Sequence, residues 1–165
     1  MSTYTITQAE PRRWAMFVIL LVGAFLPPLD FFIVNVALPA MQSELGTSSS
    51  AEQLVISSYA AVYAVTLITG GRLGDIYGRG KMFFLGLIGF AAASMLCGLA
   101  WSPWVLITGR MLQGATAAIM APQALASVQV IFPEAEKPLA LSIYGAVFGL
   151  ASVIGQEIGR ASCRE

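Results

Sequence analysis

The hydrophobic positions of the chain fall into five long stretches separated by short polar connections. Each is close to the roughly 20 residues with which an α-helix crosses the hydrocarbon core of a bilayer. The stretches are Trp14 to Pro39, Leu54 to Gly71, Met82 to Trp101, Trp104 to about Val128, and Leu139 to at least Gly155. This pattern predicts an all-α membrane protein with about five transmembrane helices. The first stretch is too long for a cleaved signal peptide.

The composition supports lipid as the main solvent. The chain has 165 residues, of which 57% are hydrophobic and 11% are charged, whereas a soluble domain is about 45–50% apolar and about 25% charged. Its 9 basic and 9 acidic residues leave no basic surplus for binding nucleic acid. With no His and only Cys97 and Cys163, we expect neither a metal site nor a disulfide framework. The sequence also lacks a nucleotide-binding loop and a nucleophile with its base, so we expect no enzyme and no cofactor.

The basic residues predict the orientation of the chain in the membrane. The connections Met41 to Gln53 and Ser102 to Pro103 contain no Lys or Arg. The basic residues of the N-terminal segment and the alternate connections are Arg12, Arg13, Arg72, Arg79, Lys81 and Lys137. Because positively charged loops stay on the cytoplasmic side, the N-terminus is expected to be cytoplasmic.

Two charges remain deep inside the stretches, Asp30 and Arg110. A charge near the bilayer centre costs roughly 2.5–3.5 kcal/mol on insertion scales and is rarely left without a partner or a task. At about 1.5 Å per helical residue, Asp30 lies roughly 14 Å inward from Pro39 and Arg110 roughly 10 Å inward from Pro103. We therefore expect the two side chains to face each other. The alternative to a functional pair is a static ion pair that pins two helices.

Small residues mark the helix faces that should meet other helices, because transmembrane helices associate through close backbone contact. Three of the stretches carry such faces. They consist of Gly86, Gly89, Ala93 and Cys97 in the third, Arg110, Gln113, Gly114, Ala117 and Ala121 in the fourth, and Gly145, Gly149 and Ser152, with Gly155 beside them, in the fifth.

The second stretch carries Tyr59, Tyr63, Thr66 and Gly70 on one face. This face either lines a weakly polar path for a substrate or forms hydrogen bonds between helices. In the first stretch, Pro27 and Pro28 lack the N–H groups that would bond the carbonyls of Gly23 and Ala24, so we expect a kink there. Irregular backbone at membrane depth is tolerated where it faces protein or a cavity, which favours a cavity beside Asp30.

The segment Gly71 to Lys81 reads as a short basic turn in which Asp75 can accept hydrogen bonds from a neighbouring helix end or from an arginine. With Gly71, Leu73, Asp75, Gly78 and Arg79, it resembles the signature cytoplasmic loop of the major facilitator superfamily. It departs from the usual pattern at Ile76 and Gly80.

Four further stretches, within a resemblance that covers Trp14 to Gln156, are similar to the branch of drug:proton antiporters with fourteen spans. The matching residues are Leu29 to Pro39 in the first span, Tyr59 in the second, Arg110, Gln113 and Gly114 in the fourth, and Gly145, Gly149 and Gly155 in the fifth. Phe32, Gln53 and Gln156 depart from the residues usual in these motifs.

The resemblance implies the N-terminal fragment of a proton-coupled, multidrug-type efflux antiporter that works by alternating access. Asp30 would carry the proton and Arg110 would modulate it. The resemblance further implies three sets of residues. They are a conformational-switch loop of Gly71, Asp75, Gly78 and Arg79, a substrate path with Tyr59, Tyr63 and Gln113, and an antiporter packing motif of Gly145, Gly149 and Gly155.

The expected organisation has three segments. Residues 1–13 form a cytoplasmic segment, residues 14–157 form helices 1–5 of the N-terminal transporter half, and residues 158–165 form a non-native tail that resembles a translated sequencing adaptor. Its arginines would emerge on the outer side, against the positive-inside rule.

The expected location is a bacterial inner membrane, and the expected partners are protons, a small drug-like or metabolite substrate, the lipid bilayer and a missing C-terminal half. Two alternatives stay open. One is a narrow-specificity metabolite exporter of the same superfamily, and the other is a non-transporting assembly or receptor protein.

Overall fold

The computed structural model describes the backbone of residues 10–45 and 49–162, with side chains within residues 12–35 and 50–158. These residues form five helices, which are α1 (Glu10–Leu45), α2 (Ser49–Tyr77), α3 (Arg79–Gly98), α4 (Pro103–Ile131) and α5 (Lys137–Ser162). Each is long and apolar enough to cross a membrane. The predicted five-helix, all-α architecture is confirmed.

The connection between α2 and α3 is shorter than the sequence suggests. The segment from Gly71 to Lys81 was expected to be a turn, but α2 continues through Tyr77 and α3 begins at Arg79. Gly78 alone makes the turn, with φ of 96°, which a residue without Cβ adopts at little cost. Because one glycine reverses the chain, the residues on either side keep their helical hydrogen bonds.

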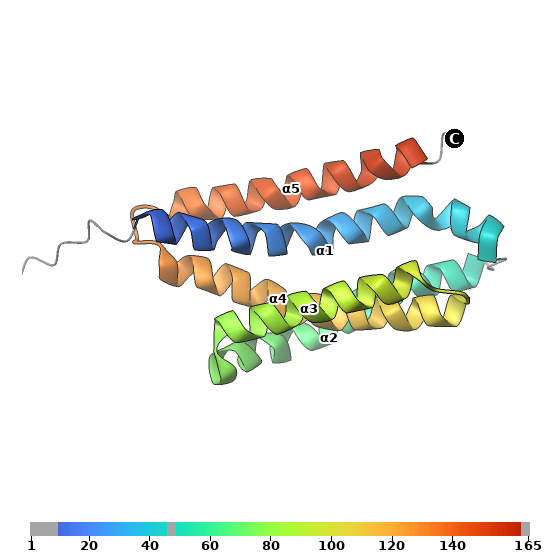
Figure 1. The fold of residues 1–165 in the computed structure, drawn as a ribbon, viewed down its shortest axis with the longest axis horizontal. Coiled ribbons are helices and arrows are strands. Elements are labelled where there is room, and N and C mark those ends of the chain that lie inside the picture. The colour runs from blue at the N-terminus through green and yellow to red at the C-terminus, as the bar shows by residue number, and fades with distance from the viewer. Residues whose placement is uncertain (1–9, 46–48, 163–165) are drawn as a thin grey trace, which may run out of the picture.

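Helix α1 remains helical through Pro27 and Pro28. Its ribbon curves along its length in Figure 1. The prolines therefore do not interrupt the helix, because two adjacent prolines remove hydrogen bonds from one turn only and the flanking turns keep theirs. The kink expected there stays a prediction. Both prolines are buried within the protein.

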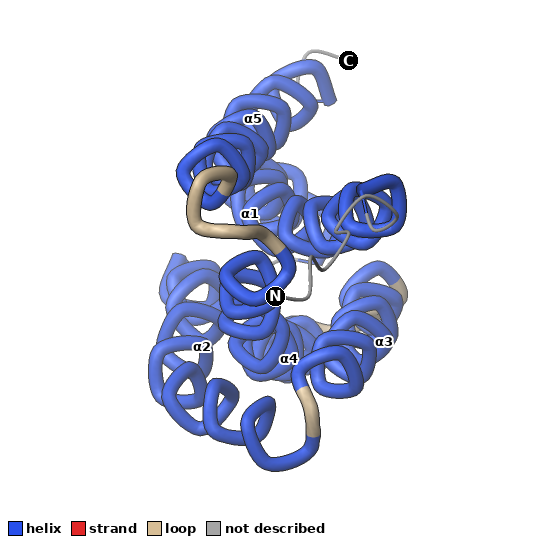
Figure 2. The backbone as a smooth tube through the Cα atoms, turned by 90° about the vertical axis from the view of Figure 1, so that its left-hand side faces the viewer, coloured by secondary structure: helices blue, strands red, loops and turns tan. Residues whose placement is uncertain are grey.

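The helices form two groups. Helices α2 and α3 pack closely on α4, α5 packs on α1, and contacts between α1 and α4 join the groups. Figure 2 shows α1 and α5 on one side and α2, α3 and α4 on the other. Helix α4 therefore lies at the centre and contacts all the others.

Glycines allow the close approach of α2 and α3 to α4. A Cβ at Gly114 would lie 2.5 Å from the carbonyl oxygen of Tyr59, and a Cβ at Gly70 would meet the carbonyl of Ala118. Gly86 and Gly89 of α3 lie against Met120 and Thr116 of α4 in the same way. The expected small-residue faces of the third and fourth stretches are thus contact faces between helices.

Helix α5 follows a different pattern. Gly145 and Gly149 are exposed, and a Cβ on either would meet no atom of the described residues within 4 Å. The residues of α5 that pack on α1 include Gly155, which lies against Phe32 and the carbonyl of Leu29. The helix continues into residues 158–162 of the expected non-native tail, and residues 1–9 and 163–165 lie outside the described part.

Candidate functional site

The two charges inside the helices face each other. Arg110 of α4 donates a hydrogen bond through Nη1 to Oδ2 of Asp30 on α1, and the two form an ion pair. The Arg110 side chain is 1% exposed and that of Asp30 is 22% exposed. The expected facing of the two charges is confirmed, and the carboxylate is the member of the pair that remains accessible.

Gln113, one helical turn after Arg110, connects the ion pair to α3. Its Nε2 donates to Oδ1 of Asp30 and to Oγ of Ser94, each at 2.9 Å. Its Oε1 accepts from Nη1 of Arg110 at 2.9 Å and from Sγ of Cys97 at 3.4 Å. We call these five residues the polar network. In a dry interior such a network is stable when its members satisfy one another.

The ring of Tyr59 covers the arginine of the polar network. The guanidinium carbon of Arg110 lies 4.4 Å from the centroid of this ring, a distance at which the cation is attracted to the π electrons. Tyr63 stacks on Tyr59 with 6.1 Å between ring centroids, and Phe31 lies 5.7 Å from Tyr59. Tyr59 therefore contacts the buried cation and also borders a neighbouring space.

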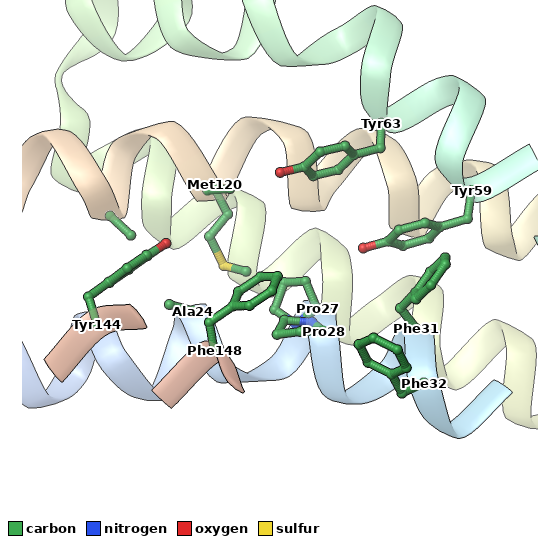
Figure 3. A pocket seen from close by; sticks show the side chains of 12 residues that line it. Ala24, Pro27, Pro28, Phe31, Phe32, Tyr59, Tyr63, Met120, Tyr144 and Phe148 are labelled. Carbon is green, nitrogen blue, oxygen red and sulfur yellow. The ribbon is translucent and has the colours of Figure 1, made fainter. Parts of the chain in front are cut away.

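That space is a cavity of about 360 Å³, within the range of pockets that hold small molecules. Helices α1, α2, α4 and α5 line it, with Ala24, Pro27, Pro28, Phe31, Phe32, Tyr59, Tyr63, Met120, Ala121, Ala124, Tyr144 and Phe148. Figure 3 shows Tyr59 and Tyr63 entering from α2, with Tyr144 and Phe148 on the opposite side. We call this space the aromatic cavity.

The aromatic cavity contains two of the three residues expected along a substrate path. Tyr59 and Tyr63 line it, whereas Gln113 is 1% exposed and belongs to the polar network instead. Pro27, Pro28 and Phe31 line the cavity on either side of Asp30 in the sequence, whereas Asp30 itself is not among the lining residues. Sequence reasoning did not identify Tyr144 and Phe148, although their spacing of four residues places them on one face of α5.

The residues of the expected switch loop meet α4. Nη2 of Arg79 donates to Oδ1 of Asp75 at 3.2 Å, and Nη1 of Arg79 donates to the carbonyl oxygen of Ala126 at 3.1 Å. Gly71 faces Pro122, and Gly78 forms the turn. Arg79 thus connects the α2–α3 turn to α4, and Asp75 accepts a hydrogen bond from an arginine as expected.

Gln123 strengthens the same junction and was not identified from the sequence. It is 1% exposed, and its Nε2 donates to the carbonyl oxygen of Gly70 at 2.7 Å. Its amide occupies the space that a Cβ of Gly74 would need. An uncharged polar residue beside Pro122 in an apolar helix is the signal that could have identified it.

Comparison with known proteins identifies the family. The profile of the Major Facilitator Superfamily matches residues 20–161. The chain belongs to this superfamily. Members of the superfamily are transporters rather than enzymes, and the five apolar helices are those of a multi-pass protein of a bacterial cell membrane. The fold is accordingly part of a major facilitator fold.

Several superfamily relatives carry names that refer to antibiotics. The probable actinorhodin transporter of Streptomyces coelicolor is 43% identical over 144 residues, which are 87% of this chain and 25% of the relative. The puromycin resistance protein of Streptomyces alboniger is 42% identical over 147 residues, 88% of this chain and 29% of the relative. The tetracenomycin C resistance and export protein of Streptomyces glaucescens is 36% identical over 148 residues, 90% of this chain and 28% of the relative. The chain thus spans about a quarter of the length of these relatives.

Proposed function

We propose that this chain is the N-terminal part of a proton-coupled exporter of small organic molecules that works by alternating access. The observation that carries the proposal is the ion pair of Asp30 with Arg110, whose guanidinium contacts Tyr59, a residue that lines the aromatic cavity. The antibiotic-related names of the relatives support export as the direction of transport. The basic residues on alternate connections support a cytoplasmic N-terminus.

Asp30 has the properties of a proton carrier because it is the accessible member of the pair. Protonation would cancel the charge that holds Arg110 to α1, while Arg110 would keep Gln113 and the ring of Tyr59 as partners. The buried cation would therefore keep these two contacts but lose its carboxylate counter-ion, which makes the charged state of Asp30 the one that favours close contact of α1 and α4. Loss of the ion pair would weaken a contact between α1 and α4, the two helices that join the groups.

A proton-dependent contact between two helix groups is what alternating access requires, because a ligand or proton shifts a conformational equilibrium only through its different affinity for the two states. With Asp30 charged, α1 is held on α4 beside the cavity. With Asp30 neutral, the groups are freer to separate at this point. Proton uptake and substrate release would thus be linked through one carboxylate.

The test is efflux driven by an imposed pH gradient, measured in vesicles that contain the transporter of which this chain is a part. Asp30→Asn mimics the protonated state permanently, so we expect gradient-driven efflux to fall at least 10-fold. Substrate exchange without a gradient should continue. Glu134→Gln is a matched control, because Glu134 is an exposed carboxylate paired with Lys137 outside the polar network.

Two outcomes would contradict the proposal. Unchanged gradient-driven efflux in Asp30→Asn would remove Asp30 as the proton carrier. Full efflux in a double variant, Asp30→Asn with Arg110→Gln, would show that the pair only pins α1 to α4.

A further inference from the structure

We infer that the aromatic cavity takes uncharged, flat aromatic molecules that carry phenolic hydroxyls, and that it discriminates against organic cations of the same shape. That such molecules are transported rests on the proposed function. Binding of ligands to the cavity is tested separately. It depends on the shape of the cavity walls, on their polar groups and on the charges behind them.

The cavity walls are suited to flat rings. Phe31 and Phe32 come from α1, Tyr59 and Tyr63 from α2, and Phe148 from α5, so aromatic rings surround the space on several sides (Figure 3). Aromatic pairs are stabilised beyond the burial of apolar area when their rings meet in offset or edge-to-face arrangements. A flat ring system entering this space can form several such contacts at once.

The polar groups on the walls are hydroxyls. Among the described residues that line the cavity, the polar side chains are Tyr59, Tyr63 and Tyr144. Tyr63 and Tyr144 extend into the cavity from different helices, α2 and α5 (Figure 3). A tyrosine hydroxyl both donates and accepts a hydrogen bond. A ligand phenol can therefore bond to either wall without carrying a charge.

The charges near the cavity are already paired. None of the described residues that line the cavity is charged. Both carboxylate oxygens of Asp30 are engaged, one by Arg110 and the other by Gln113. A ligand cation would lose its hydration, and the charge of the Asp30 carboxylate is already neutralised by Arg110. An ion without a partner pays heavily for burial.

The aromatic rings themselves could attract a cation, but Arg110 opposes this at Tyr59. Its guanidinium already occupies one face of that ring at 4.4 Å. A ligand cation on the cavity side would share the same π electrons and face a like charge behind them. At this ring, therefore, an uncharged aromatic ligand is favoured over a positive charge.

Three fluorescent probes with one ring system separate these contributions. They are pyrene, 1-hydroxypyrene and 1-pyrenemethylammonium, which differ in carrying no polar group, a phenolic hydroxyl or a cation. Saturable binding to the chain in lipid nanodiscs is measured, and nanodiscs without protein correct for partition into lipid. We expect 1-hydroxypyrene to bind most tightly, with a Kd at least 10-fold lower than that of 1-pyrenemethylammonium.

Five variants, three in the cavity and two controls outside it, test whether the probes bind there. Phe148→Ala should raise the Kd of all three probes. Phe84→Ala is the matched control, because Phe84 of α3 is similarly exposed but does not line the cavity. Tyr144→Phe should raise the Kd of 1-hydroxypyrene about 5-fold and leave that of pyrene unchanged. Tyr63→Phe repeats this test on α2, and Tyr77→Phe is its control because Tyr77 is exposed at the end of that helix.

The inference is overturned if 1-pyrenemethylammonium binds as tightly as 1-hydroxypyrene, or if Phe148→Ala leaves every Kd unchanged. Its failure is distinguishable from failure of the proposed function. Cation binding in the cavity together with gradient-driven efflux that depends on Asp30 would overturn the ligand class alone. The expected order of probes together with efflux that ignores Asp30 would overturn proton coupling alone.

Discussion

Helix α4 has two unlike faces. The face toward α2 and α3 is closed by glycines, with the backbone of Tyr59 directly against Gly114. The face toward α1 and α5 encloses the aromatic cavity and is crossed by the ion pair of Asp30 and Arg110. Dense packing resists displacement because any shift opens voids or creates clashes. Movement between helices is therefore easier to accommodate on the cavity side.

The α2–α4 contact also shows how a proline strengthens packing. Pro122 has no N–H for the carbonyl of Ala118, one helical turn earlier, and this is the carbonyl that Gly70 approaches. In return, Gln123 donates to the carbonyl oxygen of Gly70 at 2.7 Å. The two helices are thus joined by reciprocal contacts that involve the backbone of both.

Polar contacts join α1 to α4 and to the connection that follows α4. One is the polar network at Asp30. The other lies just after α4, where Arg13 pairs with Glu136 at 3.4 Å and stands 5.8 Å from the ring centroid of Phe132. In α1, Ala24 and the two prolines that line the cavity lie between Arg13 and Asp30 in the sequence. A single proton on Asp30 can therefore change one of these polar contacts and leave the other in place.

The largest expected effect concerns the ion pair between α1 and α4. Arg110→Met leaves the Asp30 carboxylate without its ion-pair partner, so the free energy of unfolding should fall by about 3–5 kcal/mol. Adding Asp30→Asn should recover most of that loss, because no uncompensated charge then remains. Unfolding in mixed detergent micelles measures both values, and Arg72→Met is the control at an exposed position. If the double variant is no more stable than Arg110→Met, electrostatic pairing does not hold α1 to α4.

The second-largest expected effect concerns the close contact of α2 with α4. Gly114→Ala places a Cβ 2.5 Å from the carbonyl oxygen of Tyr59, where backbone rather than a flexible side chain must move. Such overpacking costs about 1–3 kcal/mol, measured in the same unfolding experiment. Gly149→Ala is the matched control on α5, where the added carbon meets open space. Equal stability of the two variants would mean that the close approach of α2 to α4 is not rigid.

The ion pair can be predicted from the sequence, because the positions of the two charges within their own apolar stretches are enough to suggest it. A charge at membrane depth requires a partner, and Asp30 and Arg110 were the two charges at similar depth in the apolar stretches. The number of helices can also be predicted from the apolar stretches, because the thickness of the bilayer sets the length of each span. Both inferences need only the position of a residue along its own helix.

Residues whose placement depends on neighbouring helices were harder to predict. Gln113 and Tyr59 both lie on polar faces, yet Gln113 joins the polar network and Tyr59 lines the cavity. Tyr144 and Phe148 read as ordinary apolar residues of a membrane helix until α1 and α2 are placed beside them. Helical periodicity gives the face of a residue but not the helix that this face meets.

The smallest expected effect concerns the exposed stripe of α5. Gly145→Ala should leave the stability of this chain unchanged or raise it by up to about 1 kcal/mol, because alanine favours a helix and no described atom lies within 4 Å of the added carbon. Gly145→Leu should be similarly harmless in the chain. The antiporter packing motif predicted from Gly145 and Gly149 requires the opposite in the complete transporter, where the stripe would be covered. The free energy of unfolding of both variants, measured in this chain and in the complete transporter, tests whether the stripe is a contact face. A loss of about 1–3 kcal/mol in the transporter alone would mark the stripe as a contact face, whereas equal stability in both contexts would confine tight glycine packing to the α2, α3 and α4 group.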